Sequence, residues 1–226
     1  MHMIFLQAFG KACPSNTNII EFTDELKQLV LDTHNSYRNE IACGEVDGYD
    51  KAARMATLVW HDELAKFAEY NVRRCIFGHD KCRNTEKFLY AGQNLGKSKN
   101  NKEFEMAEDI IKTLHVGWFG EKKDANMTII KKYNKTEKKI GHFTQLVRDQ
   151  AYAVGCALVQ FEKDGWFTSI FGCDYSLTNI LNKSIYAPVN SDSTNSASKC
   201  KTGTNPEFKC LCSANEVYTN KLYYKN

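Results

Sequence analysis

Two segments with the composition of β-strands, joined by a short connection, constrain the fold of this chain most strongly. In the first, two sets of residues alternate: Val154, Cys156, Leu158 and Gln160 with Ala153, Gly155, Ala157 and Val159. In the second, β-branched and aromatic residues surround Cys173, which is again typical of strands. The connection, residues 162–165, ends in Asp-Gly, and glycine accepts the positive φ of a tight turn at low cost. We therefore predict a hairpin in which Cys156 and Cys173 face each other and form a disulfide.

The cysteines also indicate the compartment. The chain has nine, without repeated C-x-x-C pairs, which favours a disulfide framework over a zinc ribbon or an iron–sulfur site. An extracellular location follows. Three N-glycosylation sequons, which begin at Asn126, Asn134 and Asn182, fit that location. The first 13 residues have an apolar patch but lack the basic start of a signal peptide, so we expect a mature secreted chain preceded by an added methionine.

Length and charge exclude some classes of protein. With 226 residues, we expect one core with extensions. Lysine and arginine number 30 against 27 aspartate and glutamate, an excess too small for nucleic acid to be the main partner. No apolar run approaches the roughly 18 to 20 residues of a membrane span.

Lysines are concentrated in one segment. Residues 122–139 contain seven lysines against Asp124 and Glu137. The favoured interpretation is a solvated and glycosylated loop. The alternative is contact with an anionic surface such as a sulfated glycan, which salt would weaken.

Helical periodicity divides the rest of the chain. A first helix is predicted from the N-cap Thr23 to Gly44, a second from His61 or Asp62 to Cys75, and a third from about Glu103. Residues 77–98 read as an irregular loop that is functional or held by disulfides. We expect an N-terminal arm over 1–20, a main domain over 21–188, and a linker with a cysteine-bearing tail over 189–226.

Four ordered motifs carry a family resemblance. They are HNSYR at 34–38, AGQNL at 91–95, GHFTQLV at 141–147 and FGCDYSLTN at 171–179. Together they resemble the signatures of the CAP superfamily, also called SCP/TAPS. GHDKCRNT, the glutamine in AGQNL, and CKTGTNP followed by LCS resemble more narrowly the insect antigen 5 branch, particularly the secreted and salivary proteins of flies. The resemblance covers roughly residues 13–219.

The resemblance implies an α+β fold: a three-layer α-β-α sandwich with a central antiparallel sheet, held by disulfides and followed by a cysteine-bearing C-terminal extension. It also implies a cleft tetrad at His79, Gln93, Glu121 and His142, which in some members binds zinc or another divalent metal. Two imidazoles and a carboxylate suit zinc or copper. Gln93 stands where many branches have glutamate, and its neutral carbonyl is either a weak ligand or a hydrogen-bond partner of the ligands. The alternative is a set of hydrogen-bonded cleft residues without an ion.

Other residues have less specific readings. His34 is expected to pack and hydrogen-bond within its helix, and His115 has no evident partner. Arg148 stands where relatives commonly have tryptophan, so we expect altered and more exposed packing there.

Disulfide pairs follow from the same resemblance. Antigen 5 proteins imply the pairs Cys13–Cys75, Cys156–Cys173 and Cys200–Cys212. Cys43 with Cys82 is a guess, because the usual N-terminal partner of Cys82 is missing. The odd cysteine then suggests an intermolecular bridge through Cys210, so the chain is expected to be a monomer or a weak dimer.

The function expected from the resemblance is binding. No G-x-S-x-G nucleophile motif is present, and the cysteines are assigned to bridges, so a metal-dependent hydrolase or a copper redox protein is less favoured. The leading hypothesis is a secreted, non-enzymatic salivary effector that binds a host protein or small mediator and modulates haemostasis or immunity. The chain lacks an Arg-Gly-Asp tripeptide. The alternative is a lipid or sterol carrier whose tunnel is lined by Phe104, Ile111 and Trp118, although their helical spacing favours a place in the core.

Overall fold

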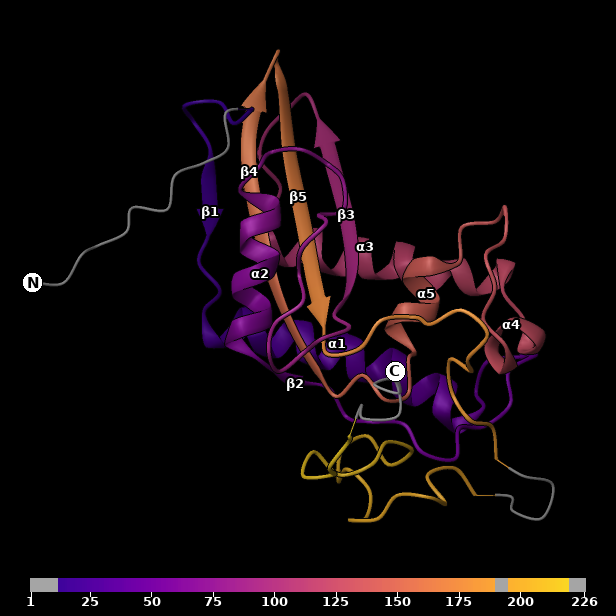
Figure 1. Cartoon of the computed structure of the whole chain (residues 1–226). Helices are drawn as coiled ribbons and strands as arrows, with labels where there is room; N and C mark the ends of the chain where they lie inside the picture. The colour runs from indigo at the N-terminus through magenta and orange to yellow at the C-terminus, as the bar shows by residue number, and fades with distance from the viewer. Residues whose placement is uncertain (1–11, 190–194, 220–226) are drawn as a thin grey trace, which may run out of the picture.

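The computed structural model describes residues 12–189 and 195–219 as three layers, with a β-sheet between helices (Figure 1). The helices are α1 (Asp24–Cys43), α2 (Asp62–Val72), α3 (Ala107–Gly120), α4 (Met127–Lys131) and α5 (Gly141–Leu146), with a 3₁₀ turn, η1 (Glu121–Asp124). The strands are β1 (Asn18–Ile20), β2 (Val59–Trp60), β3 (Gly92–Asn100), β4 (Ala153–Lys163) and β5 (Trp166–Tyr175). The predicted α-β-α sandwich is confirmed.

The sheet is built around the predicted hairpin. Its strand order is β1-β4-β5-β3 with antiparallel neighbours, and the short β2 pairs parallel to β4. Cys156 is the register partner of Cys173. The turn uses Asp164 and Gly165, both with positive φ (55° and 72°), which matches the right-handed twist of the flanking strands.

The two faces of the sheet bury different helices. Leu158 and Phe171 belong to a large core with α1 and α3, whereas Val159 and Ile170 pack against α2. Alternation along the strands places these two sets on opposite faces. A Cβ on Gly155 would lie 2.1 Å from the backbone nitrogen of Ala65, so α2 approaches β4 too closely for any other residue there. Within 12–189 and 195–219, no helix is long and apolar enough to cross a membrane.

Helix α1 begins and ends where local chemistry predicts. The Thr23 hydroxyl accepts a hydrogen bond from Leu26 N, and Gly44 ends the helix with a φ of 72°. Its inner face carries Arg38, a fully buried residue whose guanidinium donates to backbone carbonyls. The acceptors are Ala56, Leu146, Arg148, Asp149 and Ala151. Arg38 thus connects α1 to the segment before β2 and to the segment from the end of α5 to β4.

Two element predictions were wrong. The third helix begins at Ala107 rather than near Glu103, and Phe104 lies outside it, 40% exposed against the ring of Phe167. The segment expected to be irregular includes most of β3, which begins at Gly92. Glycine, asparagine and lysine disfavour a strand locally, but pairing with β5 along its whole length imposes one.

Arg148 is also a correction. It was expected in a more exposed environment, yet it is 1% exposed. Its guanidinium donates to the carbonyls of Ser184 and Ile185 and lies 3.8 Å from the carboxylate of Asp149. The two carbonyls and the nearby carboxylate offset part of the cost of burying this guanidinium.

Four disulfides connect the described chain. Cys13–Cys75, Cys156–Cys173 and Cys200–Cys212 are the pairs that the resemblance implies. The guess that Cys43 pairs with Cys82 was wrong, because Cys43 is bonded to Cys210. Cys210 is therefore not available for an intermolecular bridge, and the unbridged cysteine is the exposed Cys82.

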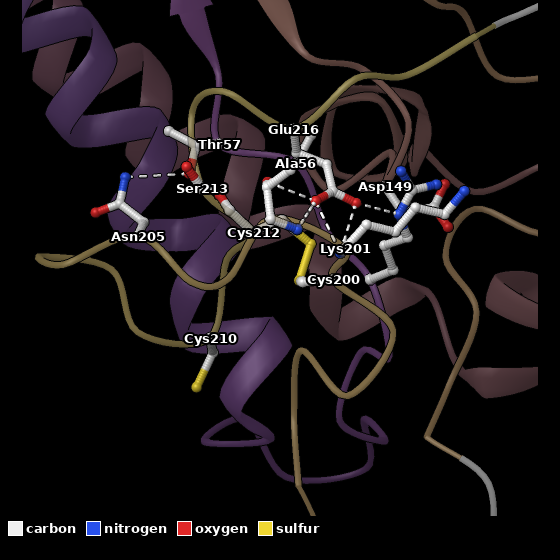
Figure 2. Close-up of a disulfide and its surroundings, with 12 residues drawn as sticks. Ala56, Thr57, Asp149, Cys200, Lys201, Asn205, Cys210, Cys212, Ser213 and Glu216 are labelled. Carbon is white, nitrogen blue, oxygen red and sulfur yellow. Dashed lines mark hydrogen bonds and ion pairs between the residues drawn. A yellow bond between two sulfur atoms is a disulfide. The ribbon is translucent and has the colours of Figure 1, made fainter.

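The C-terminal tail is attached to the body through side-chain and backbone bonds as well as sulfur (Figure 2). Thr57 Oγ1 donates to the Cys212 carbonyl, and Cys212 N donates to Met55 O. The buried Glu216 carboxylate accepts from the backbone N–H groups of Lys201 and Thr202 and pairs with Arg54 at 2.7 Å. The tail consequently packs as part of the same body.

Candidate functional site

An open cleft of about 730 Å³ lies beside α5. All four residues of the predicted tetrad, His79, Gln93, Glu121 and His142, line it. They come from the loop after α2, the start of β3, η1 and α5. The structure therefore brings together residues that are separated by up to 63 positions in the sequence, and it adds polar neighbours that sequence reasoning did not select.

His142 and Glu121 form one half of the cleft. His142 Nδ1 lies 2.7 Å from Glu121 Oε1. Glu121 Oε2 accepts the backbone N–H groups of His142 and Phe143. Although burial opposes the charged form, these hydrogen bonds hold the pKa of Glu121 below its ordinary value. With the Nδ1 proton directed at Glu121, Nε2 is the ring nitrogen that remains for a ligand.

Gln93 is the centre of the other half. Its Oε1 lies 2.8 Å from His79 Nδ1, and its Nε2 donates to Asp174 Oδ1 at 2.8 Å and to Asp80 Oδ2 at 3.2 Å. Since one end of the side chain accepts and the other donates to two carboxyl groups, an amide satisfies all three contacts. A glutamate would present an oxygen to both carboxyl groups, so glutamine fits this position on local chemistry alone.

Asp174 is the residue that motif reading missed. It lies on β5 with no exposed surface, and its Oδ2 has no hydrogen-bond partner among the described residues. Burial raises the pKa of Asp174 to about 8, against a lowering influence from the Gln93 hydrogen bond. An aspartate inside the apolar run of a central strand is the sequence signal that would have drawn attention to it.

A chain of buried polar groups lies behind the cleft. His115 Nδ1 lies 2.7 Å from Ile111 O, and His115 Nε2 lies 3.0 Å from His34 Nδ1. His34 Nε2 lies 2.8 Å from Tyr175 Oη, which accepts from Asn94 Nδ2 at 3.3 Å. His34 therefore packs and hydrogen-bonds as predicted, and His115 has a partner after all.

Asn94 links this chain to the cleft. Its Nδ2 also donates to the His142 carbonyl at 3.1 Å. The orientation of α5 therefore depends on the buried histidines as well as on Glu121.

The cleft residues pair with one another more readily than they form a metal site. Gln93 Oε1 is taken by His79, and Glu121 accepts three hydrogen bonds. Within residues 12–189 and 195–219, no three His, Cys, Asp or Glu side chains are grouped to hold a metal. Zinc and copper sites need more donors than two imidazole Nε2 atoms, so this arrangement does not fit a preformed site.

The rim of the cleft is basic. Arg83, Lys135, Lys138 and Lys139 line it, all from segments that precede β3 or α5. Arg83 pairs with Asp80 at 3.2 Å and Lys138 lies 3.7 Å from Asp124. The lysine-rich segment predicted as a surface loop thus forms one wall of the cavity.

The family assignment rests on the match of sequence as well as fold. The model of the cysteine-rich secretory protein family, CAP, matches residues 31–175. The chain belongs to the CAP family. Within that family, venom allergen-1 of Aedes albopictus is 40% identical over 220 residues, which is 96% of this chain and 84% of the relative. The antigen 5 like allergen Cul n 1 of Culicoides nubeculosus is 41% identical over 160 residues, 70% of this chain and 72% of the relative.

A further CAP relative has a name that refers to inhibition. Tabinhibitin 4 of Tabanus yao is 32% identical over 209 residues, 92% of this chain and 80% of the relative. The chain is therefore of the antigen 5 and venom allergen type, as the motifs predicted.

Solved CAP structures share the fold. NaASP2 with Zn²⁺ has a TM-score of 0.67 at 24% identity and covers 89% of this chain and 100% of its own. BmVAL-1 has a TM-score of 0.68 at 20% identity, covering 89% and 98%.

The remaining predicted residues lie away from the cleft floor or within the core. Asn126, Asn134 and Asn182 are all exposed, and Asn126 caps α4 through its side chain, so glycosylation there stays a prediction. Ile111 and Trp118 are buried in the main core, whereas Phe104 lies on the surface. These three residues do not line one tunnel.

Proposed function

We propose that this protein is a secreted, non-enzymatic CAP protein of the antigen 5 type, delivered in saliva, that binds a host protein or small mediator and thereby modulates haemostasis or immunity. Binding in the central cleft is the mechanism that we favour. Four disulfides support an extracellular setting. The similarity to insect venom allergens and antigen 5 proteins supports the biological context.

One observation carries the proposal: the cleft is open, its two histidines are held by hydrogen bonds within the protein, and its rim is basic. His142 is oriented by Glu121 and His79 by Gln93, so both imidazoles are preorganised before a ligand arrives. Preorganised groups lose little conformational freedom on binding, which favours affinity. Lys135 and Lys139 on the rim favour a ligand, or the part of a protein partner, that carries negative charge.

A second property supports binding over chemistry. The polar groups nearest the two histidines are a carboxylate and an amide that hold the rings in place. This arrangement fixes the ring orientation and leaves each Nε2 to accept a hydrogen bond from a ligand. Ile111 and Trp118 pack in the core, which does not favour the carrier alternative.

Capture from plasma tests the proposal. The immobilised protein is incubated with plasma at physiological salt, and bound proteins and extracted small molecules are identified by mass spectrometry. A rim variant, Lys135→Glu with Lys139→Glu, should lose the captured component. A matched variant in the tail, Lys201→Glu with Lys209→Glu, has the same charge change on exposed residues away from the cleft and should retain it.

The result that would overturn the proposal is clear. Recovery of nothing above the level of a blank matrix would contradict binding. Equal capture by the rim variant and the wild type would show that the captured component binds outside the cleft.

A further inference from the structure

A basic and aromatic surface lies at the hairpin end of the sheet, on the face that α2 covers elsewhere. Helix α2 ends at Val72, and in Figure 1 the β4–β5 turn extends beyond it. Register pairs Lys97 with Ile170, Lys99 with Thr168 and Lys163 with Trp166. Since cross-strand partners share a face, the three lysines project from one side of the sheet. Residues of this surface enclose a hollow of about 200 Å³, lined by Phe77, Lys97, Lys99, Phe161, Lys163 and Thr168 among others.

Aromatic rings hold two of these lysines. Lys97 Nζ lies 5.3 Å from the ring centroid of Phe77, and Lys99 Nζ lies 4.4 Å from that of Trp166. Both distances are within the range of cation–π attraction. Phe77 and Trp166 are 48% and 40% exposed, so part of each side chain is accessible to a ligand. The rings thus position the ammonium groups without neutralising their positive charge.

No described carboxylate forms an ion pair with Lys97, Lys99 or Lys163. Among the described residues, Asp164 in the turn is the only acidic one that lines the hollow. By contrast, Lys122, Lys131 and Lys138 of the lysine-rich segment are paired with Glu40, Asp50 and Asp124. The hairpin surface therefore has positive charge that an incoming anion can meet without displacing a protein carboxylate.

The spacing of the lysines selects the kind of anion. Lys97 and Lys99 are two residues apart on one strand, about 7 Å, and β3 and β4 are two strand spacings apart, about 9 to 10 Å. Side chains so spread do not converge on a single phosphate. They suit a linear polyanion with charges repeated along its length, and the exposed faces of Phe77 and Trp166 suit the apolar faces of sugar rings.

We propose that this surface, defined by Lys97, Lys99, Lys163, Phe77 and Trp166, binds a sulfated polysaccharide. It adjoins the central cleft, which Phe77 also lines, but its lysines lie outside that cleft. It would concentrate the protein on extracellular matrix or cell surfaces where such chains occur. A membrane is the less favoured partner, because Asp164 and the half-buried Glu162 lie at the hairpin end that would enter the headgroup layer.

Size-defined heparin oligosaccharides provide the probe. Binding is measured by calorimetry at several salt concentrations, with desulfated heparin as the blank. The triple variant Lys97→Gln, Lys99→Gln, Lys163→Gln should weaken binding by about fivefold for each lysine, roughly 100-fold in all. The plot of log K against log salt concentration should become shallower, with the magnitude of its negative slope reduced by about two to three. Trp166→Ala should weaken binding while leaving the melting temperature nearly unchanged, because the ring is exposed.

A matched triple variant provides the control. Lys135→Gln, Lys138→Gln, Lys139→Gln removes the same charge from the cleft rim and should retain heparin affinity within about threefold. Equal loss in both triple variants would reduce the effect to net charge and overturn the proposal. Absence of heparin binding would also overturn the proposal. It would do so even if vesicles of phosphatidylcholine and phosphatidylserine bound through the same lysines.

Discussion

The buried pair His34 and His115 predicts that stability falls in mild acid. Both rings lie in the core with no exposed surface. Burial lowers the pKa of His115 to about 4, and burial together with the neighbouring His115 lowers that of His34 well below its ordinary value. In the neutral pair, His34 Nδ1–H can be shared between Val30 O and His115 Nε2. If His115 Nε2 were protonated, its N–H would face the N–H of His34 Nδ1, and the hydrogen bond between the two rings would be lost.

The magnitude follows from linkage between protonation and unfolding. An unfolded His115 would titrate near 6.5 and the folded one near 4, so between these values the unfolded chain binds more protons. Stability from His115 is therefore complete above about pH 6.5 and is lost as the pH falls toward 4. A shift of about 2.5 units at roughly 1.4 kcal/mol each corresponds to ~3 kcal/mol. Proteins of this size have a total of about 5–15 kcal/mol, so the loss is large.

The assay compares the wild type with His115→Gln. The glutamine carbonyl can accept from His34 but does not titrate, so the variant should be less stable at pH 7.5 and have a flatter pH profile. Guanidinium unfolding is followed by tryptophan fluorescence from pH 7.5 to 4.5 with the disulfides intact. The raised pKa values of Asp149 (about 6) and Asp174 (about 8) add stability as the pH falls, but equally in both proteins, so they cancel in the difference. Parallel profiles for the two proteins would refute the reasoning.

Three further predictions concern the core, the free thiol and metal. Arg38→Leu should destabilise the fold by about 3–5 kcal/mol, because several buried carbonyls lose their donor, and Arg38→Lys should recover only part of this in the same unfolding assay. Ellman's reagent should detect one thiol per native chain, and Cys82→Ser should remove it; a second reactive thiol would contradict the Cys43–Cys210 bridge. Calorimetric titration with zinc or copper should give only weak binding that disappears in His142→Ala, whereas tight binding unchanged by that substitution would contradict the pairing of the cleft residues.

Local signals predicted the elements that depend on local chemistry. Thr23 and Gly44 bound α1 because a cap and a left-handed stop act within a few residues. Asp164-Gly165 closes the hairpin for the same reason. In contrast, β3 exists because β5 pairs with it, and no window of sequence around Gly92 carries that information.

The candidate site was also only partly predictable from local sequence. Family motifs located the four cleft residues, but the role of each depends on contacts across the fold. From the sequence, Gln93 is interpreted as a weakened metal ligand. In the structure it is a hydrogen-bond partner instead, because its amide donates to Asp80 and Asp174. The Cys43–Cys210 pair could not be predicted, because the two cysteines are 167 residues apart and are brought together only when the tail packs on α1.

The Cys43–Cys210 bridge has a consequence for biosynthesis. Cys13 and Cys75 can meet once the first third of the chain has entered an oxidising compartment, but Cys43 must wait until nearly the last residues have been translated. During that interval the Cys43 thiolate can attack a disulfide that has already formed, such as Cys13–Cys75, and release one of its cysteines as a thiolate. Pairing of Cys43 with Cys210 then requires that any such exchange be reversed after the tail has packed on α1. A shortened recombinant chain that stops before Cys210 would leave both Cys43 and Cys200 without their native partners, in addition to the free Cys82.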